Sequence, residues 1–185
     1  MPRTRLTSIP QQRNKEAAMV VVNIVDRENG LVLLKHNIRG ISAGKLLGPG
    51  GKVDPKDESL EAAAKREVRE ETGLDVRNLR YTGVLRDKMH VVHFFSTNTF
   101  SGTLRPKIDE GESRWYSPDE IPYEKMWPES SSLMPLLFTG SEYKFDINVT
   151  HSNGIRSYKM KVEVGRFTYA VENGMLVSFA GLNAA

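Results

Sequence analysis

The segment from Gly51 to Leu74, GKVDPKDESLEAAAKREVREETGL, constrains this chain more than any other part of its sequence. Glu70 and Glu71 follow Glu67 by three and four residues, so in an α-helix all three side chains lie on one face. Like charges at these spacings destabilise a helix by about 0.2–0.5 kcal/mol per pair, and a divalent cation removes that repulsion. Carboxylate oxygens are ligands that Mg²⁺ prefers. The segment therefore predicts a helix with one face directed at a metal ion.

The ends of this helix are also marked in the sequence. Ser59 is a good N-cap residue, and Glu61 places a negative charge in the first turn, where the helix dipole favours it. Gly73 is a natural residue to follow the last helical turn. The apolar stripe that would pack against the rest of the protein consists of Leu60, Ala63, Ala64 and Val68.

The same segment resembles the Nudix box, the signature of enzymes that hydrolyse a nucleoside diphosphate linked to another group. Residues 66–74, REVREETGL, match the second half of that signature without exception, and seven residues separate Glu58 from Arg66 as the signature requires. The match is long and highly specified. A solvated charged helix would explain the acids, but it would not explain the glycines and Arg66 as well.

The departure from the signature lies at its front. Six residues, rather than five, separate Gly51 from Glu58. We place the extra residue in the loop Asp54–Asp57, because an insertion within the helix would rotate the later glutamates by about 100°. Asp57 has the five-residue spacing from Gly51. Eight residues then separate it from Arg66, however, so Glu58 is preferred as the box acid.

The resemblance implies a site for Mg²⁺, with Mn²⁺ as an alternative ion. Clustered carboxylates that hold such ions stabilise charge on phosphate groups and make water nucleophilic. Catalytic roles are expected for Glu67 and Glu70. Arg66 is expected to orient an acid, either Glu58 or Glu70, through a charge-assisted hydrogen bond. The implied metal ligands are the backbone of Gly51 and the carboxylates of Glu67, Glu70 and Glu71.

A second acidic stretch, IDEGES, contains Asp109, Glu110 and Glu112. Residues 108–137 resemble the matching part of the mammalian-type oxidised-purine-nucleotide (8-oxo-dGTP) diphosphatases. In that subfamily an acidic pair precedes an aromatic strand, and its glutamate approaches the metal site. Glu110 is the matching position, so the resemblance implies a metal or base role for it. A solvated acidic loop is the alternative.

The run WPES at residues 127–130 resembles the base-binding run of the same subfamily, in which a tryptophan stacks on the purine and two acids bind its edge. Trp127 and the first acid, Glu129, are retained, whereas Ser130 replaces the second acid. We expect Trp127 to stack on a nucleobase and Glu129 to accept hydrogen bonds from it. The alternative for Trp127 is an aromatic residue of the core.

One further base contact of the subfamily, an asparagine, corresponds to Leu47 here. A site that recognises a base by hydrogen bonds discriminates strongly only when its polar partners are present. Specificity for 8-oxoguanine is therefore expected to be weak, unless Asn37 or Arg39 reaches the base from the preceding loop.

The rest of the chain predicts an α+β fold, and the resemblance implies a Nudix-type α/β/α sandwich with a mixed sheet and extra C-terminal β-hairpin segments. Asn153-Gly154 and Asn173-Gly174 are strong hairpin signals. A second helix is predicted at Ser130–Phe138. Strands are predicted at Ala18–Val25, Gly30–Lys35, Leu79–Leu85, His90–Phe100, Ser113–Tyr116, Tyr143–Val149, Ile155–Val164, Thr168–Val171 and Met175–Phe179.

The 185 residues suit one domain with short additions. We expect a basic, flexible arm at residues 1–16, for which a targeting segment is the weaker alternative, and a Nudix domain at 17–164. Residues 165–185 are expected to be a β extension packed on the domain. A net charge of +3 suits a phosphate-bearing ligand but indicates no nucleic-acid partner. No stretch is long and apolar enough to span a membrane.

The absence of cysteine is compatible with the reducing cytoplasm, where we expect the protein to act in nucleotide-pool sanitation. The expected activity is Mg²⁺-dependent hydrolysis of a purine nucleoside triphosphate, oxidised or not, to the monophosphate and pyrophosphate. Alternatives are hydrolysis of a dinucleotide or nucleotide sugar, and a non-catalytic nucleotide sensor. The retained box glutamates argue against a sensor. The oligomeric state stays open.

Overall fold

The computed structural model of the chain describes residues 17–105 and 111–181. The helices in this part are α1 (Leu60–Thr72), α2 (Ser130–Phe138) and the short 3₁₀ helices η1 (Pro118–Glu120) and η2 (Tyr123–Lys125). The strands within residues 17–105 are β1 (Ala17–Asp26), β2 (Leu31–Asn37), β3 (Leu46–Leu47), β4 (Gly50–Lys52), β5 (Asp75–Arg77), β6 (Arg80–Arg86), β7 (His90–Thr97) and β8 (Thr99–Ser101). The later strands are β9 (Gly111–Tyr116), β10 (Tyr143–Ser152), β11 (Ile155–Val164), β12 (Phe167–Glu172) and β13 (Met175–Gly181).

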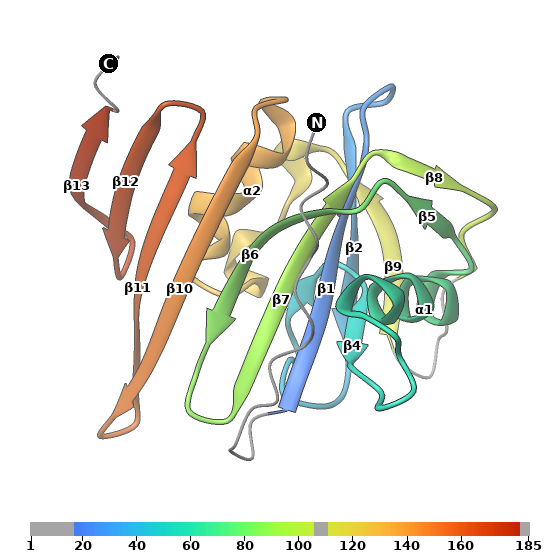
Figure 1. Cartoon of the computed structure of the whole chain (residues 1–185), viewed down its shortest axis with the longest axis horizontal. Coiled ribbons are helices and arrows are strands. Elements are labelled where there is room, and N and C mark those ends of the chain that lie inside the picture. Colours follow the sequence, from blue (N-terminus) through green and yellow to red (C-terminus); the bar gives the residue numbers. More distant parts are fainter. Residues whose placement is uncertain (1–16, 106–110, 182–185) are drawn as a thin grey trace.

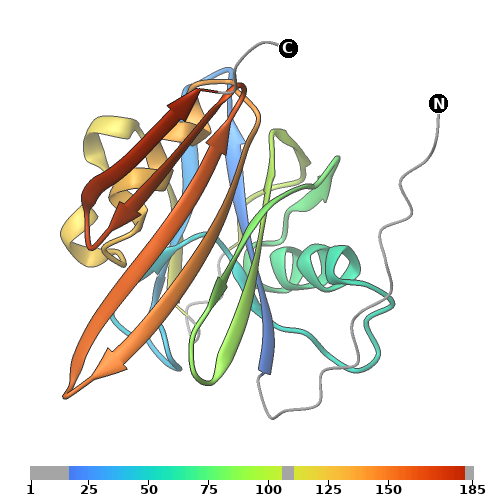
Figure 2. The same cartoon turned by 60° about the vertical axis from the view of Figure 1, so that its left-hand side comes forward.

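One large mixed sheet separates the two α-helices, so that α1 covers one face and α2 the other (Figures 1 and 2). The strand order is β13-β12-β11-β10-β6-β7-β1-β2-β3, with β4 pairing with β1 and β9 with β2. β1 is parallel to β7 and β6 is parallel to β10, whereas the other pairs are antiparallel. The predicted α+β sandwich with a mixed sheet is therefore confirmed.

Successive side chains of β1 point alternately to the two faces of the sheet. Val20, Val22 and Ile24 are fully buried in the core that includes α1. Successive side chains of a strand point to opposite faces, so the intervening Val21 and Asn23 face the other side, where they line a cavity. The core on that side joins α2 to β10 and β11.

The predicted ends of helix α1 are observed. The Ser59 side chain accepts a hydrogen bond from the Ala62 amide at 3.0 Å. Gly73 adopts the left-handed conformation with φ of 74°, and its amide donates to the Arg69 carbonyl. Both signals are local to the helix, which is why the sequence indicates them well.

The prediction of a single strand over His90–Phe100 is wrong. β7 ends at Thr97, and β8 pairs with β5 in a separate two-stranded sheet. The Thr97 hydroxyl accepts from the Thr99 amide at 3.0 Å and donates to the Arg77 carbonyl. This local side-chain bonding competes with the strand ladder and turns the chain.

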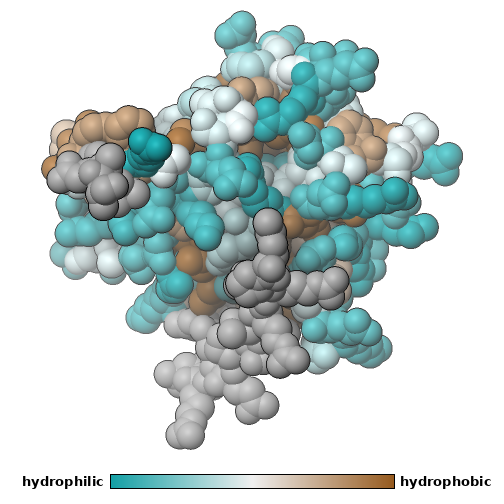
Figure 3. Space-filling model, turned by 45° about the horizontal axis from the view of Figure 1, so that its top comes forward, coloured by the Kyte–Doolittle hydropathy of each residue, from teal (hydrophilic) through white to brown (hydrophobic). Residues whose placement is uncertain are grey.

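Two Asn-Gly turns connect the last four strands in pairs, β10 to β11 and β12 to β13. Both residues of each turn have positive φ, 51° and 78° at Asn153-Gly154 and 49° and 87° at Asn173-Gly174, as two-residue hairpins of type I′ require. β12 and β13 extend the sheet at its edge instead of covering a face (Figure 1). Apolar side chains gather at this end of the molecule (Figure 3), and Met175, Leu176, Val177 and Phe179 of β13 are all exposed.

The arm predicted at residues 1–16 lies outside the described residues. Within the described part, no helix is long and apolar enough to cross a membrane.

Candidate active site

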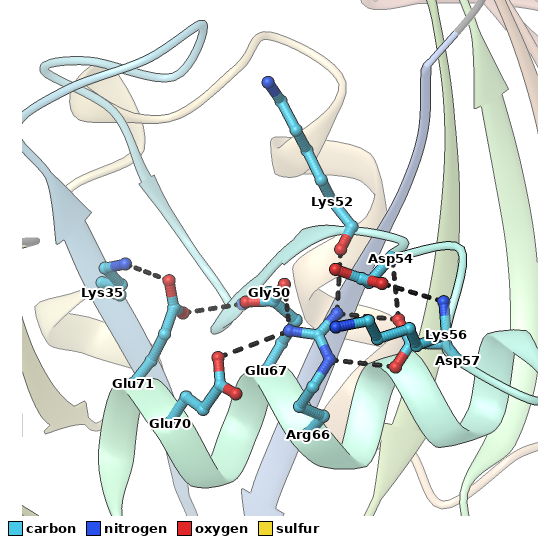
Figure 4. A network of polar contacts seen from close by, with 10 residues as sticks. All are labelled: Lys35, Gly50, Lys52, Asp54, Lys56, Asp57, Arg66, Glu67, Glu70 and Glu71. Atoms are coloured by element: carbon cyan, nitrogen blue, oxygen red, sulfur yellow. Dashed lines mark hydrogen bonds and ion pairs between the residues drawn. The ribbon is translucent and has the colours of Figure 1, made fainter.

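Arg66 of α1 is the centre of a polar network that joins the helix to the preceding loop (Figure 4). Its Nε and Nη2 donate to the two carboxylate oxygens of Asp57 at 2.9 and 2.8 Å, and Nη2 also donates to the Lys52 carbonyl at 3.0 Å. Of the two acids expected to pair with Arg66, Glu70 accepts at 3.3 Å. Glu58 is exposed and its expected place is taken by Asp57, the acid with the five-residue spacing.

The two hydrogen bonds between Arg66 and Asp57 join a charged donor to a charged acceptor. The hydrogen bonds from Arg66 lower the pKa of Asp57, and the same bonds raise the pKa of Arg66. Both groups therefore stay ionised, and the loop is fixed against the first turns of α1.

Glu67 lies against the glycine turn of β4. A side-chain carbon added to Gly51 would approach Glu67 Oε2 to 2.5 Å, so the carboxylate occupies the space that glycine leaves free. Arg66 Nη1 donates to Glu67 Oε1 at 2.8 Å. Burial nevertheless raises the pKa of Glu67, and the nearby Glu71 and Glu70 raise it further. Burial therefore outweighs the contact with Arg66, which by itself lowers the pKa of Glu67.

Glu71 is buried and engaged on both oxygens. Lys35 of β2 pairs with Oε1, and the Gly50 amide donates to Oε2 at 2.9 Å. Only about a twentieth of each partner's side chain is exposed, 5% for Lys35 and 6% for Glu71. Glu71 therefore fixes the glycine turn against α1 in this structure. Sequence reasoning did not identify Lys35, although a lysine within the apolar run GLVLLK was an available signal.

The described residues contain no group of three or more acids, histidines or cysteines already gathered as a metal site. The donor chemistry nevertheless fits a hard cation. Glu67 and Glu70 share a single Nη1 of Arg66, which places both carboxylates within reach of one positive group. The carboxylates of Glu67 and Glu70 therefore suit Mg²⁺ or Mn²⁺. Glu71, the third expected carboxylate ligand, has both oxygens engaged by Lys35 and the Gly50 amide.

A cavity of about 410 Å³ lies on the opposite face of the sheet, between β1, β7, β10 and α2. Its walls are mainly apolar, and Leu47, Trp127, Glu129 and Ser130 all line it. A larger, open groove of about 870 Å³ on β10–β12 is lined by both charged and apolar side chains, none of them from the box.

Residues 46–52 lie between the cavity and the carboxylates. Leu47 and Gly48 line the cavity, whereas Gly50 and Gly51 contact Glu71 and Glu67. One short segment thus connects an apolar, aromatic-lined cavity to an acidic face. This arrangement suits a ligand that carries a flat ring at one end and phosphates at the other.

A model of the family described as NUDIX domain matches residues 14–137, which is most of the chain. The chain belongs to the NUDIX family. This Nudix chain is 34% identical to the oxidized purine nucleoside triphosphate hydrolase of Mus musculus over 142 residues, covering 74% of this chain and 89% of the mouse protein. The protein of the same name from Danio rerio is 36% identical over 114 residues, covering 58% of this chain and 72% of the fish protein.

The solved structures agree on the fold. A MutT protein from Bacillus halodurans superposes with a TM-score of 0.59 at 20% identity, covering 89% of this chain and 96% of that chain. The family model and the mouse relative confirm the resemblance to the Nudix family and the enzyme class: the chain is a Nudix hydrolase.

Glu129 of this Nudix hydrolase is 3% exposed, and both of its carboxylate oxygens accept hydrogen bonds from Arg156 of β11, at 2.9 and 2.7 Å. The Arg156 guanidinium lies 4.7 Å from the centre of the Trp127 ring, and Lys45 Nζ lies 5.3 Å from it. Trp127 is half-buried at the cavity wall. Sequence reasoning missed Arg156, because nothing in its local sequence links it to a tryptophan on another element.

Asn37 of the Nudix chain lies away from the cavity lining. The Asn37 amide donates to the carbonyls of Lys35 and Lys45 at 3.3 and 3.2 Å, which holds the β2–β3 loop, and Asn37 is not among the residues that line the cavity. Glu110 lies outside the described residues.

Proposed function

We propose that this Nudix hydrolase converts a purine nucleoside triphosphate to the monophosphate and pyrophosphate, with Mg²⁺ as its cofactor. One observation carries the proposal: the segment at residues 46–52 connects an aromatic-lined cavity to the acidic face of α1, where Gly51 lies against Glu67 and the Gly50 amide donates to Glu71. The mouse and zebrafish relatives, whose names specify oxidized purine nucleoside triphosphates, support the substrate class.

The proposed roles follow from the contacts. Glu67 and Glu70, with the Gly51 backbone, hold the metal ion, which on binding supplies charge neutralisation at the phosphates and a more acidic water. Arg66 keeps Glu67 and Glu70 side by side on α1. Glu71 holds the glycine turn at the distance that Glu67 requires. Glu110 is retained as a candidate base in the part of the chain that follows residue 105.

The cavity is proposed to hold the base against Trp127. Leu47 offers no hydrogen bond at the position where the subfamily has a polar contact, and a missing hydrogen bond to a buried partner costs about 1–3 kcal/mol. We therefore propose modest discrimination between 8-oxo-dGTP and dGTP. Action in the cytoplasm on the nucleotide pool completes the proposal, in line with a chain that has no cysteine.

The experiment is a hydrolysis screen of the purified chain over dGTP, 8-oxo-dGTP, dATP, a dinucleotide and a nucleotide sugar, with product analysis. We expect a nucleoside monophosphate and pyrophosphate from the triphosphates, activity lost in EDTA and restored by Mg²⁺, and a preference for 8-oxo-dGTP below about 100-fold, or 2.7 kcal/mol. Turnover of only the dinucleotide or sugar would refute the substrate class. A larger preference for 8-oxo-dGTP would refute the specificity.

A further inference from the structure

The Arg156–Glu129 pair and the adjacent Trp127 form one unit on the cavity wall. The side chain of Arg156 is 20% exposed and that of Glu129 is 5% exposed, so the carboxylate is buried and the guanidinium is partly buried. The Arg86–Asp146 pair offers a comparison, because it has the same chemistry but lies on the outer surface, with both side chains nearly half exposed. Of the two pairs, only Arg156–Glu129 is largely shielded from solvent and lies beside the Trp127 ring.

Stability alone does not account for a buried ion pair at this place. Replacing such a pair by apolar residues of similar volume is often neutral or stabilising, because desolvation of the two charges offsets their attraction. The surrounding cavity wall is mainly apolar, so an apolar pair would suit it. The position of Arg156 and Glu129 on the wall of a cavity that suits a nucleobase therefore points to a contact with the ligand.

The pair retains hydrogen-bonding capacity after its internal bonds are counted. A guanidinium has five N–H groups, and two of those of Arg156 donate to Glu129. Each carboxylate oxygen of Glu129 accepts one of these bonds and has a second lone pair. A donor and an acceptor are therefore presented side by side, with no net charge, next to the ring that would stack on the base.

We infer that Arg156 is a specificity-determining residue that, with Glu129, recognises a 6-oxopurine edge. A 6-oxopurine presents a carbonyl acceptor beside an N–H donor, which complements a guanidinium beside a carboxylate. In DNA recognition the commonest specific base contact is arginine bonded to guanine O6 and N7, which shows that a guanidinium suits the 6-carbonyl. Adenine lacks the carbonyl. This inference rests on the proposed function, and it adds a residue of β11, beyond the part matched by the family model.

The test compares kcat/KM for dGTP, dITP and dATP in Mg²⁺ for the full chain and its variants. Arg156→Lys keeps the charge beside Glu129 but loses the planar fork. Arg156→Met combined with Glu129→Gln removes both charges, so no unpaired charge stays buried. Thermal unfolding shows whether each variant is folded. Arg86→Lys is the matched control on the outer surface.

We expect the wild type to prefer dGTP and dITP over dATP, and both preferences to fall at least about tenfold in each Arg156 variant, mainly through KM. The Arg86 control should keep the wild-type ratios. Ratios within twofold of wild type in the folded Arg156 variants, or a wild-type preference for dATP, would overturn the inference while the proposed function stands. A wild type that hydrolyses none of the three nucleotides would overturn the proposed function itself and the inference with it.

Discussion

Glu70 has the most solvent-accessible carboxylate of the three on the acidic face of α1: 51% of its side chain is exposed, against 14% for Glu67 and 6% for Glu71. Its contact with Arg66 at 3.3 Å is weak, so little of the fold depends on it. Glu70→Gln should lower kcat by roughly 10²–10⁴-fold if the residue is a ligand or base. The measurement is steady-state hydrolysis, with thermal unfolding to confirm the fold.

The control for this variant is Glu61→Gln, on the same helix. Glu61 forms an exposed ion pair with Lys65 and has no contact with the acidic face. Its replacement should leave turnover within twofold of wild type. Wild-type turnover in Glu70→Gln would remove Glu70 from the proposed site.

Gly51 is constrained by the carboxylate that lies on it. Gly51→Ala would add a carbon 2.5 Å from Glu67 Oε2, so Glu67 must move away from the turn. We expect a lower apparent affinity for Mg²⁺ and at least about a tenfold loss of kcat, because small displacements of catalytic groups are costly. A Mg²⁺ titration of activity measures both, and an unchanged titration curve would contradict the placement of Gly51 in the site.

At the scale of elements, the Lys35–Glu71 pair joins strand β2 to helix α1. Breaking a buried ion pair by removing one partner costs about 3–5 kcal/mol, since the other charge stays buried. Lys35→Met should therefore lower the unfolding midpoint by about 6–20 °C for a chain of this size. Differential scanning fluorimetry measures the shift.

Lys65→Met is the comparison at an exposed pair on α1. Surface pairs of this kind contribute about 0–1 kcal/mol, so its midpoint should change by no more than a few degrees. Equal shifts in the two variants would show that the Lys35–Glu71 pair does not join the elements as described.

At the scale of the whole molecule, the two C-terminal strands differ in what they bury. β12 contributes Val171, which is 5% exposed, and Asn173 exchanges two hydrogen bonds with the backbone of Tyr158 at 2.8 and 3.1 Å. The large side chains of β13 are exposed instead. Deleting residues 165–185 should lower the unfolding midpoint by about 5–10 °C, because the buried valine alone is worth about 1.5–3 kcal/mol.

Deleting only residues 175–185 keeps β12 and the Asn173 contacts, and it should change the midpoint by only a few degrees. The larger deletion should also weaken nucleotide binding, since it leaves β11, which carries Arg156, as the edge strand. Equal stability of the two truncated chains would show that β12 is not integrated in the fold.

The sequence by itself determined the features that depend on short-range spacing. The acidic face of α1, its caps at Ser59 and Gly73, and the two Asn-Gly turns are each specified within a few residues, because helix periodicity and turn conformations are local properties. The box motif adds the family and the enzyme class, since it specifies many positions at once. These predictions needed no knowledge of the neighbours in space.

Only the tertiary structure decided which groups meet across the sheet. Lys35 reaches Glu71 from β2, and Arg156 reaches Glu129 from β11, over 36 and 27 residues of chain. No local pattern predicts such pairs, because strand order and register determine them. The choice of Asp57 over Glu58 is of the same kind, since it depends on how the loop folds back on Arg66. The charges around the carboxylates and the cavity are therefore set by packing, which brings together residues far apart in the chain.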